Sequence, residues 1–265
     1  MNFLPLTVPN VKIMIDFASD QGLVFMEVRD PEAKLTLGEC KELATYARLK
    51  HVEAVYALNV GAMASNSNYF EVLARGIANT LVFDGPKMIR SGCNGPEFIS
   101  DEKKIYWMAD EFAQLVQNIN QAGNTAKMFG LSLSVENARE AFCGDGINTF
   151  GISQLFGAQG VNTNVDWQLD VANFFSVSRL PKQPNEVKGF FEENVGRISY
   201  THLKSSIEGE NQPILCGNDL SFDVYLDSLA KNNKVYVVIE LTEAETLEAV
   251  YDNHRKSIAY LTSSY

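Results

Sequence analysis

Short apolar runs rich in β-branched residues alternate along the chain with longer amphipathic segments, and this alternation limits the fold more than any other feature. Seven of the runs are expected to be strands, at residues 23–28, 53–60, 86–92, 131–136, 165–170, 197–202 and 235–240. Strands that alternate with helices are typical of βα units and of a parallel sheet. The pattern therefore argues against an antiparallel sandwich.

The amphipathic segments space their apolar residues by three and four positions, as helices do. They cover residues 9–22, 37–50, 69–81, 105–130, 147–156, 185–194, 222–232 and 247–264. A barrel of eight βα repeats uses about 31 residues for each repeat, which suits a chain of 265 residues. We expect a single domain, residues 1–265, folded as a (β/α)8 TIM barrel. A first strand has only residues 2–7 available, a short segment interrupted by Pro5, so whether this strand is short or missing stays open.

Composition and charge exclude several classes of protein. Hydrophobic residues make up 46% of the chain, which is too many for a disordered protein. The formal net charge is −11, and an acid excess opposes nucleic-acid binding, which depends on clustered Lys and Arg. No apolar run approaches the roughly 18 residues of a membrane span. We expect a protein without nucleic-acid or membrane partners; its oligomeric state stays open, a homo-oligomer included.

The cysteines and the start of the chain indicate a location. Cys40, Cys93, Cys143 and Cys216 form no CxxC pair, so a zinc ribbon or thioredoxin-type site has no support. The first ten residues lack the basic segment and long apolar core of a signal peptide. A reducing cytoplasm is the expected location.

Four of the expected strands in the second half of the chain end on residues that can bind a metal. These residues are Glu136, Asp170, His202 and Glu240, separated by 34, 32 and 38 positions. Each interval matches one βα unit, so the four side chains are expected at one height on consecutive strands. They would meet at the C-terminal rim, where the active sites of such barrels lie.

The chemistry of these four residues favours one divalent cation. Three carboxylates and an imidazole without a counterion would repel one another and raise the carboxylate pKa values. Three oxygen donors and one nitrogen suit Mn²⁺, Mg²⁺ or Co²⁺, and Zn²⁺ remains an alternative. The chain has only 3 histidines, which leaves room for one mononuclear, carboxylate-rich site.

Four motifs carry a resemblance to a known family. The segments SVEN, LDVAN, ISYTHLK and VVIE contain the four candidate ligands, and they resemble the sugar phosphate isomerase/epimerase family with a xylose isomerase-like TIM barrel. The resemblance implies that all four residues bind one cation and that Glu136 and Glu240 act as catalytic acid and base. It implies an isomerase or epimerase for a sugar or polyol-derived ketone, transferring a proton through an enediolate. A lyase (dehydratase) and a sugar-binding barrel without turnover are the alternatives.

Further residues are candidates for substrate contacts. Lys204 shares the strand face of His202, Arg90 ends a strand, and Glu27 lies on another, so each can face the barrel mouth. Arg29 follows the same strand as Glu27 and could bind an anionic group. The resemblance adds Asn173 and Glu208 as substrate contacts, at positions where many members of the family carry His and Arg. An acid that the ketose 3-epimerases carry six residues after the first glutamate is here Phe142.

Overall fold

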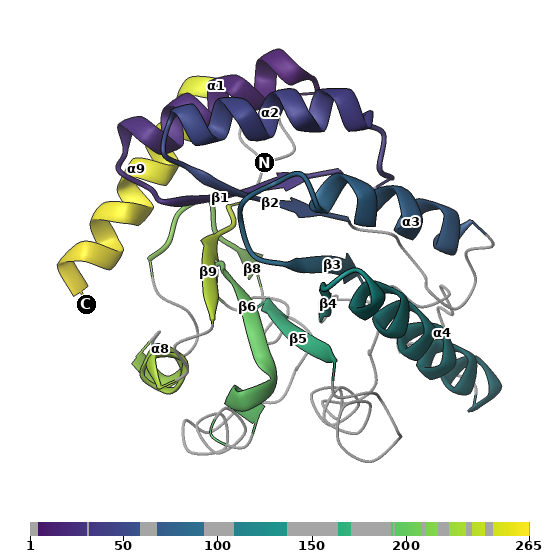
Figure 1. Cartoon of the computed structure of the whole chain (residues 1–265). Helices are drawn as coiled ribbons and strands as arrows, with labels where there is room; N and C mark the ends of the chain where they lie inside the picture. The colour runs from purple at the N-terminus through teal and green to yellow at the C-terminus, as the bar shows by residue number, and fades with distance from the viewer. Residues whose placement is uncertain are drawn as a thin grey trace, which may run out of the picture.

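Parallel strands arranged in a ring form the frame of the molecule (Figure 1). The computed structural model describes residues 5–30, 32–58, 68–92, 109–136, 164–170, 192, 194–207, 210–216, 223–231, 235–241 and 246–264. Seven strands lie in the order β1-β2-β3-β4-β5-β6-β9 and form a nearly closed barrel, which confirms the predicted fold. Their bounds are Phe25–Arg29, Glu53–Ala57, Met88–Gly92, Ser132–Glu136, Val165–Asp170, Ile198–Leu203 and Tyr236–Ile239.

Helices surround the ring of strands (Figure 1). They are α1 (Val8–Asp20), α2 (Leu37–Leu49), α3 (Tyr69–Thr80), α4 (Ala109–Met128), α8 (Asp223–Ala230) and α9 (Leu247–Ser264), with a short 3₁₀ turn η1 at Val195–Arg197. A small antiparallel hairpin, β7 (Ser206–Ile207) with β8 (Glu210–Asn211), was not predicted. The predicted helix 147–156 lies outside the described residues, as does 185–194 apart from 192 and 194.

Local signals in the sequence account for several helix ends. Helix α2 begins with a capping box, in which the Thr36 side chain accepts from the Glu39 backbone and Glu39 accepts from the Thr36 backbone. Helix α4 is followed by Gly130, whose φ of +72° lies in the left-handed region that glycine adopts without strain. Gly130 therefore lies where the chain leaves the helix.

Strands β1 and β9 are the two ends of the strand order, and we call the space between them the seam. Residues 2–4 of the expected first strand lie outside the described residues, while Thr7 is the N-cap of α1 and belongs to no strand. Side chains bridge the seam at both ends: Phe25 packs on Tyr236 with ring centroids 5.5 Å apart, and Arg29 donates to Glu240. The barrel is thus held closed here by side-chain contacts.

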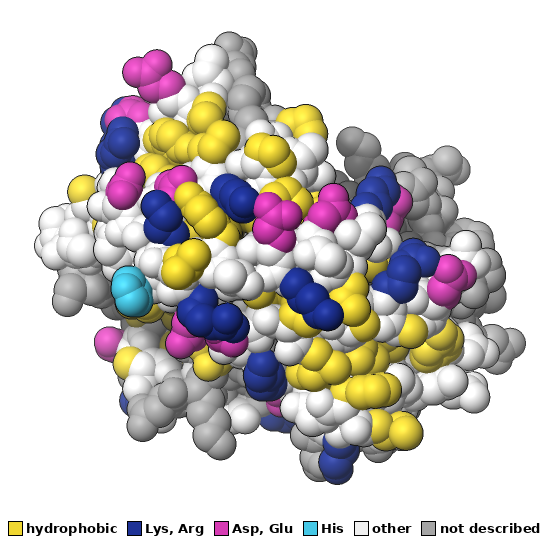
Figure 2. Space-filling view, turned by 45° about the horizontal axis from the view of Figure 1, so that its top comes forward, with side chains coloured by type: hydrophobic (Ala, Val, Ile, Leu, Met, Phe, Trp, Pro, Cys, Tyr) yellow, Lys and Arg dark blue, Asp and Glu magenta, His cyan; other side chains and the backbone are white. Residues whose placement is uncertain are grey.

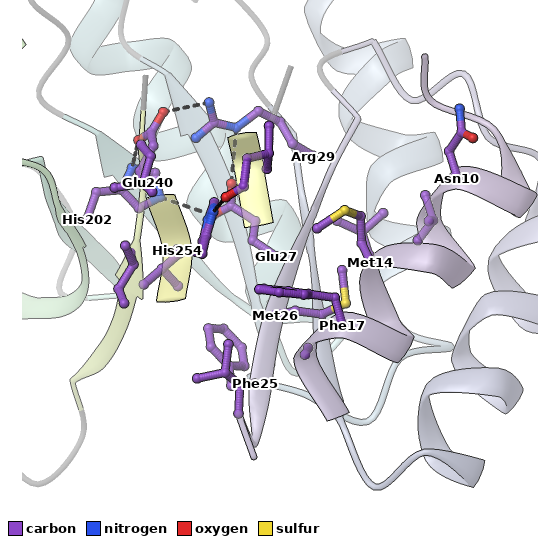
Figure 3. A pocket seen from close by; sticks show the side chains of 18 of the residues that line it. Asn10, Met14, Phe17, Phe25, Met26, Glu27, Arg29, His202, Glu240 and His254 are labelled. Carbon is purple, nitrogen blue, oxygen red and sulfur yellow. Dashed lines mark hydrogen bonds and ion pairs between the residues drawn. The ribbon is translucent and has the colours of Figure 1, made fainter. Parts of the chain in front are cut away.

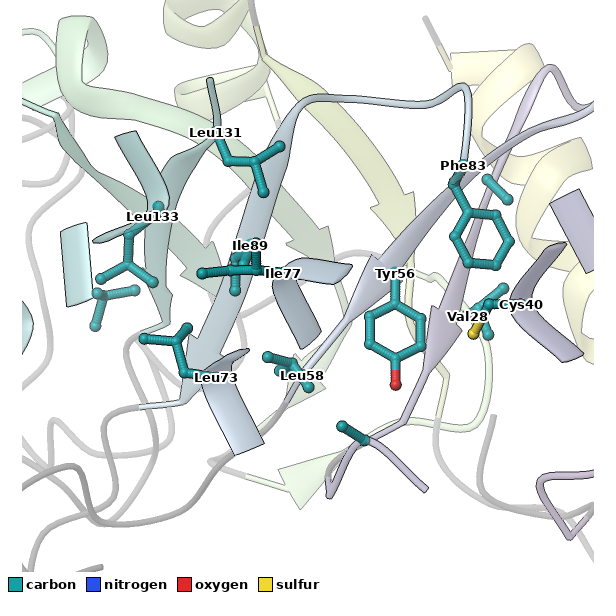
Figure 4. Close-up of a cluster of buried hydrophobic side chains, with 14 of the residues drawn as sticks. Val28, Cys40, Tyr56, Leu58, Leu73, Ile77, Phe83, Ile89, Leu131 and Leu133 are labelled. Carbon is teal, nitrogen blue, oxygen red and sulfur yellow. The ribbon is translucent and has the colours of Figure 1, made fainter. Parts of the chain in front are cut away.

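The main core lies between the strands and the helices (Figure 4). Alternate residues of each strand point to opposite faces, so Val28, Leu133 and Leu169 face the helices and are at most 2% exposed. Alternation along residues 235–240 predicts the same burial for Val237, but its side chain is 44% exposed. This prediction was wrong because alternation gives the face on which a side chain lies but not what covers that face.

A second, smaller apolar cluster fills the barrel interior below its mouth. It contains Val55, Met88 and Tyr200, with Phe25 and Val238 packed against it. Such layers of side chains make the inside of a barrel a packed core. Polar groups can therefore gather only above this layer, at the C-terminal ends of the strands.

The surface over α1 and α2 mixes basic and acidic side chains (Figure 2). Exposed ion pairs such as Lys12 with Glu42 and Arg48 with Asp84 account for this mixture. No helix among the described residues is long and apolar enough to cross a bilayer.

Candidate metal centre

The structure brings the four predicted ligand residues together at the C-terminal ends of the strands. Glu136 and Asp170 are the last residues of β4 and β5, His202 lies near the end of β6, and Glu240 directly follows β9. One ligand atom from each residue lies within 4.8 Å of the ligand atoms of the other three. This spacing is compatible with a single shared cation.

Strand register explains how residues at unequal strand positions reach one level. Glu136 is opposite Gln168, two residues before Asp170, whereas Asp170 is directly opposite His202. On the next strand His202 is opposite Val238, two residues before Glu240. A barrel of tilted strands shifts register by about one residue per strand, so a stagger of this size keeps the four side chains at a common height.

The imidazole of His202 presents Nδ1 to the three carboxylates. Nδ1 lies 2.5 Å from Glu240 Oε2, 3.3 Å from Glu136 Oε1 and 3.9 Å from Asp170 Oδ2. Glu240 Oε2 is buried, and the His202 imidazole lies directly against it. A cation bound between these atoms would give this oxygen a partner in place of the imidazole proton. The donor set therefore fits the predicted metal.

Three basic side chains surround the cluster and pair with its carboxylates. Arg90 donates to Glu136 and, at 2.7 Å, to Glu27. Arg29 donates to Glu240 at 2.8 Å. Lys204 Nζ lies 3.2 Å from Asp170 and 3.5 Å from Glu240. Every candidate carboxylate ligand thus has a basic partner.

A buried hydrogen-bond network anchors the loop that follows Arg29. Asp30 is fully buried and accepts from the backbone N–H groups of Lys34 and Leu35 and from the hydroxyl of Tyr56, at 2.5 Å. The carboxylate thereby replaces the main-chain partners that the chain loses on leaving β1. This anchor fixes the end of β1, from which Arg29 reaches the cluster.

Burial and charge shift the ionisation of the ligands in opposite directions. Burial alone would lower the pKa of His202, but the negative charges of Glu240 and Glu27 raise this pKa to about 10. Burial favours the neutral form of Glu136, but the positive charge of Arg90 lowers its pKa to about 2. Burial and the neighbouring carboxylates raise the pKa of Asp170 in spite of Lys204. Without a metal, His202 is therefore protonated at neutral pH, and its charge takes the place of a cation.

The other predicted candidates divide into two groups. Arg90, Lys204 and Glu27 were predicted to contact substrate. They lie at the cluster, and in the structure they contact its carboxylates and imidazole. Asn173 and Glu208 lie outside the described residues.

Sequence reasoning did not select two site residues. Gln168 accepts from Arg90 and places Nε2 3.3 Å from the His202 ring, and Tyr200 donates to Glu27. Both share the strand face of the ligands, so the alternation of side chains along β5 and β6 was the signal that could have found them.

A cavity of about 210 Å³ extends from the cluster along the seam (Figure 3). Its polar end is formed by Glu27, Arg29, His202 and Glu240. The remainder is mostly apolar, with Phe17 of α1 and Val250 of α9 among its lining residues. The cavity therefore connects the cluster, along the seam, with the space under α1 and α9.

Comparisons with solved structures identify the fold of the chain. No family model matches the sequence, and no curated protein matches it either. Among solved structures, the 3-keto-D-glucoside 4-epimerase of E. coli aligns with a TM-score of 0.73 at 14% identity, over 99% of this chain and 97% of that one. The D-allulose 3-epimerase of Methylomonas sp., in complex with D-allulose, aligns with a TM-score of 0.72 at 12% identity, over 98% and 93%.

A third solved structure is a complex with a metal. A xylose isomerase-like TIM barrel protein of Mycobacterium smegmatis, in complex with magnesium, aligns with a TM-score of 0.68 at 14% identity, over 97% of this chain and 90% of that chain. A sugar phosphate isomerase/epimerase of Parabacteroides distasonis aligns similarly, with a TM-score of 0.72. The chain therefore has the fold of the xylose isomerase-like TIM barrels.

Proposed function

We propose that the protein is a divalent-metal-dependent isomerase or epimerase that acts on a sugar or a polyol-derived ketone. The observation that carries this proposal is the convergence of Glu136, Asp170, His202 and Glu240, with ligand atoms within 4.8 Å of one another. Structures with the same fold include epimerases of D-allulose and of 3-keto-D-glucosides, and one is a complex with magnesium. Mn²⁺, Mg²⁺ or Co²⁺ fits three oxygens and one nitrogen, and Zn²⁺ fits less well.

Two carboxylates give the site a means of moving a proton. When bound, a divalent cation polarises a carbonyl and a neighbouring hydroxyl, and the adjacent C–H becomes more acidic. One of Glu136 and Glu240 removes that proton, and the other returns a proton to the opposite face or to the next carbon. Return to the same carbon gives an epimer, whereas return to the next carbon gives an isomer.

The basic side chains support this chemistry. Charge develops on the substrate oxygens as the proton leaves, and Lys204, whose side chain is 11% exposed, lies beside both Asp170 and Glu240. The positive charge of a lysine at this place stabilises an enediolate. Arg29 and Arg90 hold Glu240 and Glu136 in their ionised forms, and a general base must be ionised to accept a proton.

Metal analysis followed by isotope exchange tests the proposal. Protein purified without a chelator should contain close to one equivalent of Mn, Mg, Co or Zn, and adding these ions to stripped protein should raise its unfolding temperature. In D₂O, the metal-loaded protein should incorporate deuterium into one member of a panel of ketoses and inososes.

The outcomes of these measurements separate the alternatives. Absence of any metal and of any thermal shift would overturn the metal-enzyme proposal. Sugar binding without deuterium incorporation would indicate a binding protein, and loss of water from the substrate would indicate a dehydratase.

A further inference from the structure

Glu27 is the one carboxylate at the cluster that does not belong to the four candidate ligands among the described residues. It lies in the middle of β1, and its side chain is 7% exposed. The sequence suggested a substrate contact for this residue. In the structure both of its oxygens are instead engaged by protein groups (Figure 3).

Each oxygen of Glu27 has a separate set of partners. Oε2 lies 3.1 Å from His202 Nε2 and accepts from the Tyr200 hydroxyl at 2.8 Å. Oε1 accepts from Arg90 at 2.7 Å and from Arg29 at 3.1 Å. Burial opposes ionisation of Glu27, but the charges of Arg90, His202 and Arg29 lower its pKa well below the usual range. The side chain is therefore a charged acceptor held at four points.

The two nitrogens of His202 consequently have different neighbours. Nδ1 faces the oxygens of Glu136, Asp170 and Glu240, whereas Nε2 faces only one carboxylate oxygen, that of Glu27, among the described residues. A cation in the cluster would be bound through Nδ1, which must then carry no proton. The remaining ring proton stays on Nε2, where Glu27 accepts it.

We infer that Glu27 is a positioning residue of the metal centre, which fixes the ring orientation and the tautomer of His202 and links the two arginines that hold Glu136 and Glu240. The inference rests on the proposed metal-dependent function. Three of the four candidate ligands are connected to Glu27, His202 directly and the two glutamates through Arg90 and Arg29. Asp170 is held separately by Lys204.

Metal affinity is the first measurement. Glu27→Gln keeps the size of the side chain but removes its charge, and its amide can present either oxygen or nitrogen to His202 Nε2. Loss of such a partner typically weakens metal binding by about 10- to 100-fold, and we expect this change in the Kd of Mn²⁺ measured by titration calorimetry. The matched control is Glu42→Gln, which removes an exposed carboxylate paired with Lys12 and should leave the Kd unchanged.

The protonation of the histidine ring is the second measurement, and it does not depend on activity. The chain has only 3 histidines, so long-range ¹H–¹⁵N spectra of the Mg²⁺-loaded protein are simple to assign. In the wild-type protein His202 should carry its proton on Nε2 alone. In Glu27→Gln the spectrum at saturating Mg²⁺ should show a weakened hydrogen bond at Nε2, seen as an upfield shift of its proton and faster exchange with water.

A second variant keeps the inference testable if Glu27→Gln does not fold. Tyr200→Phe removes only the hydroxyl that donates to Glu27 and leaves the ring in the apolar layer with Val55 and Met88. It should weaken Mn²⁺ binding several-fold, less than Glu27→Gln.

Two results would contradict the inference in different ways. If the wild-type protein binds Mn²⁺ and the folded Glu27→Gln variant binds it equally with the same ring spectrum, the positioning role is wrong and the proposed function stands. If Glu27→Gln does not fold, wild-type affinity in Tyr200→Phe has the same meaning. If the wild-type protein binds no Mn²⁺, Mg²⁺, Co²⁺ or Zn²⁺, the proposed function fails and the inference fails with it.

Discussion

The two halves of the barrel contribute different kinds of side chain to the cluster. From the described residues of β4, β5, β6 and the end of β9 come all four candidate ligands together with Lys204. Strands β1 and β3 supply Glu27, Arg29 and Arg90, each of which contacts a ligand. The second half is thus rich in carboxylates, and the first half carries the excess of positive charge that keeps them ionised.

This division shows why the two halves differ in how they respond to a cation. A metal would replace the proton of His202 and share the charge of three carboxylates in the second half. The arginines of the first half have fixed positive charges and are needed with or without the metal. Substitutions in the second half should therefore affect catalysis and metal binding, whereas those in the first half should also affect the stability of the metal-free fold.

The largest expected effect is on proton transfer. Glu240→Gln keeps the length of the side chain and an oxygen for Arg29, but its amide cannot accept a proton. Loss of a positioned general base typically costs about 10²- to 10⁴-fold in rate, and we expect this decrease in deuterium exchange while the circular dichroism spectrum is retained. The control is Glu53→Gln, on the exposed start of β2, which should exchange like the wild type. Unchanged exchange in Glu240→Gln would show that Glu240 is not the base.

The next effect separates the two arginines of the first half. Arg90→Met leaves Glu27 and Glu136 buried without their main cationic partner, and breaking a buried pair in this way typically costs about 3–5 kcal/mol. Arg29 has a side chain that is 16% exposed, so water can replace it in part and Arg29→Met should cost less. The measurement is the free energy of unfolding of metal-free protein in urea. Equal losses for both variants would contradict the proposed difference in burial.

A pH-dependent effect distinguishes the proton from the metal. His202 has a folded-state pKa of about 10, above the ordinary value of 6.5 for histidine, so its contribution to stability is complete below pH 6.5 and disappears as pH rises toward 10. Metal-free protein should lose up to about 1.4 kcal/mol per pH unit between these values through this one proton. Metal binding must displace the same proton, so Mn²⁺ affinity should increase with pH over this range.

Calorimetry in buffers of different ionisation enthalpy measures the released proton directly. If metal binding at pH 8 neither releases nor takes up a proton, His202 is neutral before the metal binds. Stability of the metal-free protein that rises between pH 7 and 9 would also contradict a protonated His202.

The smallest effect is expected at an exposed arginine of the first half. Arg48 on α2 pairs with Asp84 through two hydrogen bonds, but both side chains are more than half exposed. Such pairs are screened by water and salt. Arg48→Gln should leave both the unfolding midpoint and Mn²⁺ affinity within the error of measurement. A marked loss would show that charge alone, and not burial at the cluster, explains the effect of Arg90.

The sequence predicted the four candidate ligands better than the residues that contact them. Glu136, Asp170, His202 and Glu240 were selected because metal-binding side chains recurred at strand ends with the spacing of one βα unit. Tyr200 and Gln168 share the same strand face, but a tyrosine or glutamine in a strand has no chemistry that distinguishes it from packing. Their contacts with Glu27 and His202 depend on strands that are far apart in sequence.

The predictions made for the strands also differ in accuracy, for a physical reason. Strands β4 and β5 were predicted closely, since their apolar and polar residues alternate without interruption. The prediction that Val237 is buried was wrong because alternation gives the face on which a side chain lies but not what covers that face.

By itself, the sequence determined the α/β alternation, the barrel and the residue types that stand at its strand ends. These properties follow from local periodicity and from the length of each repeat, which are read along the chain. Only the tertiary structure decided that Glu27 lies at His202 Nε2, that Glu136 and Glu240 each have their own arginine, and that side chains close the seam. Those contacts join residues more than 40 positions apart, and their geometry is set by barrel closure and strand tilt.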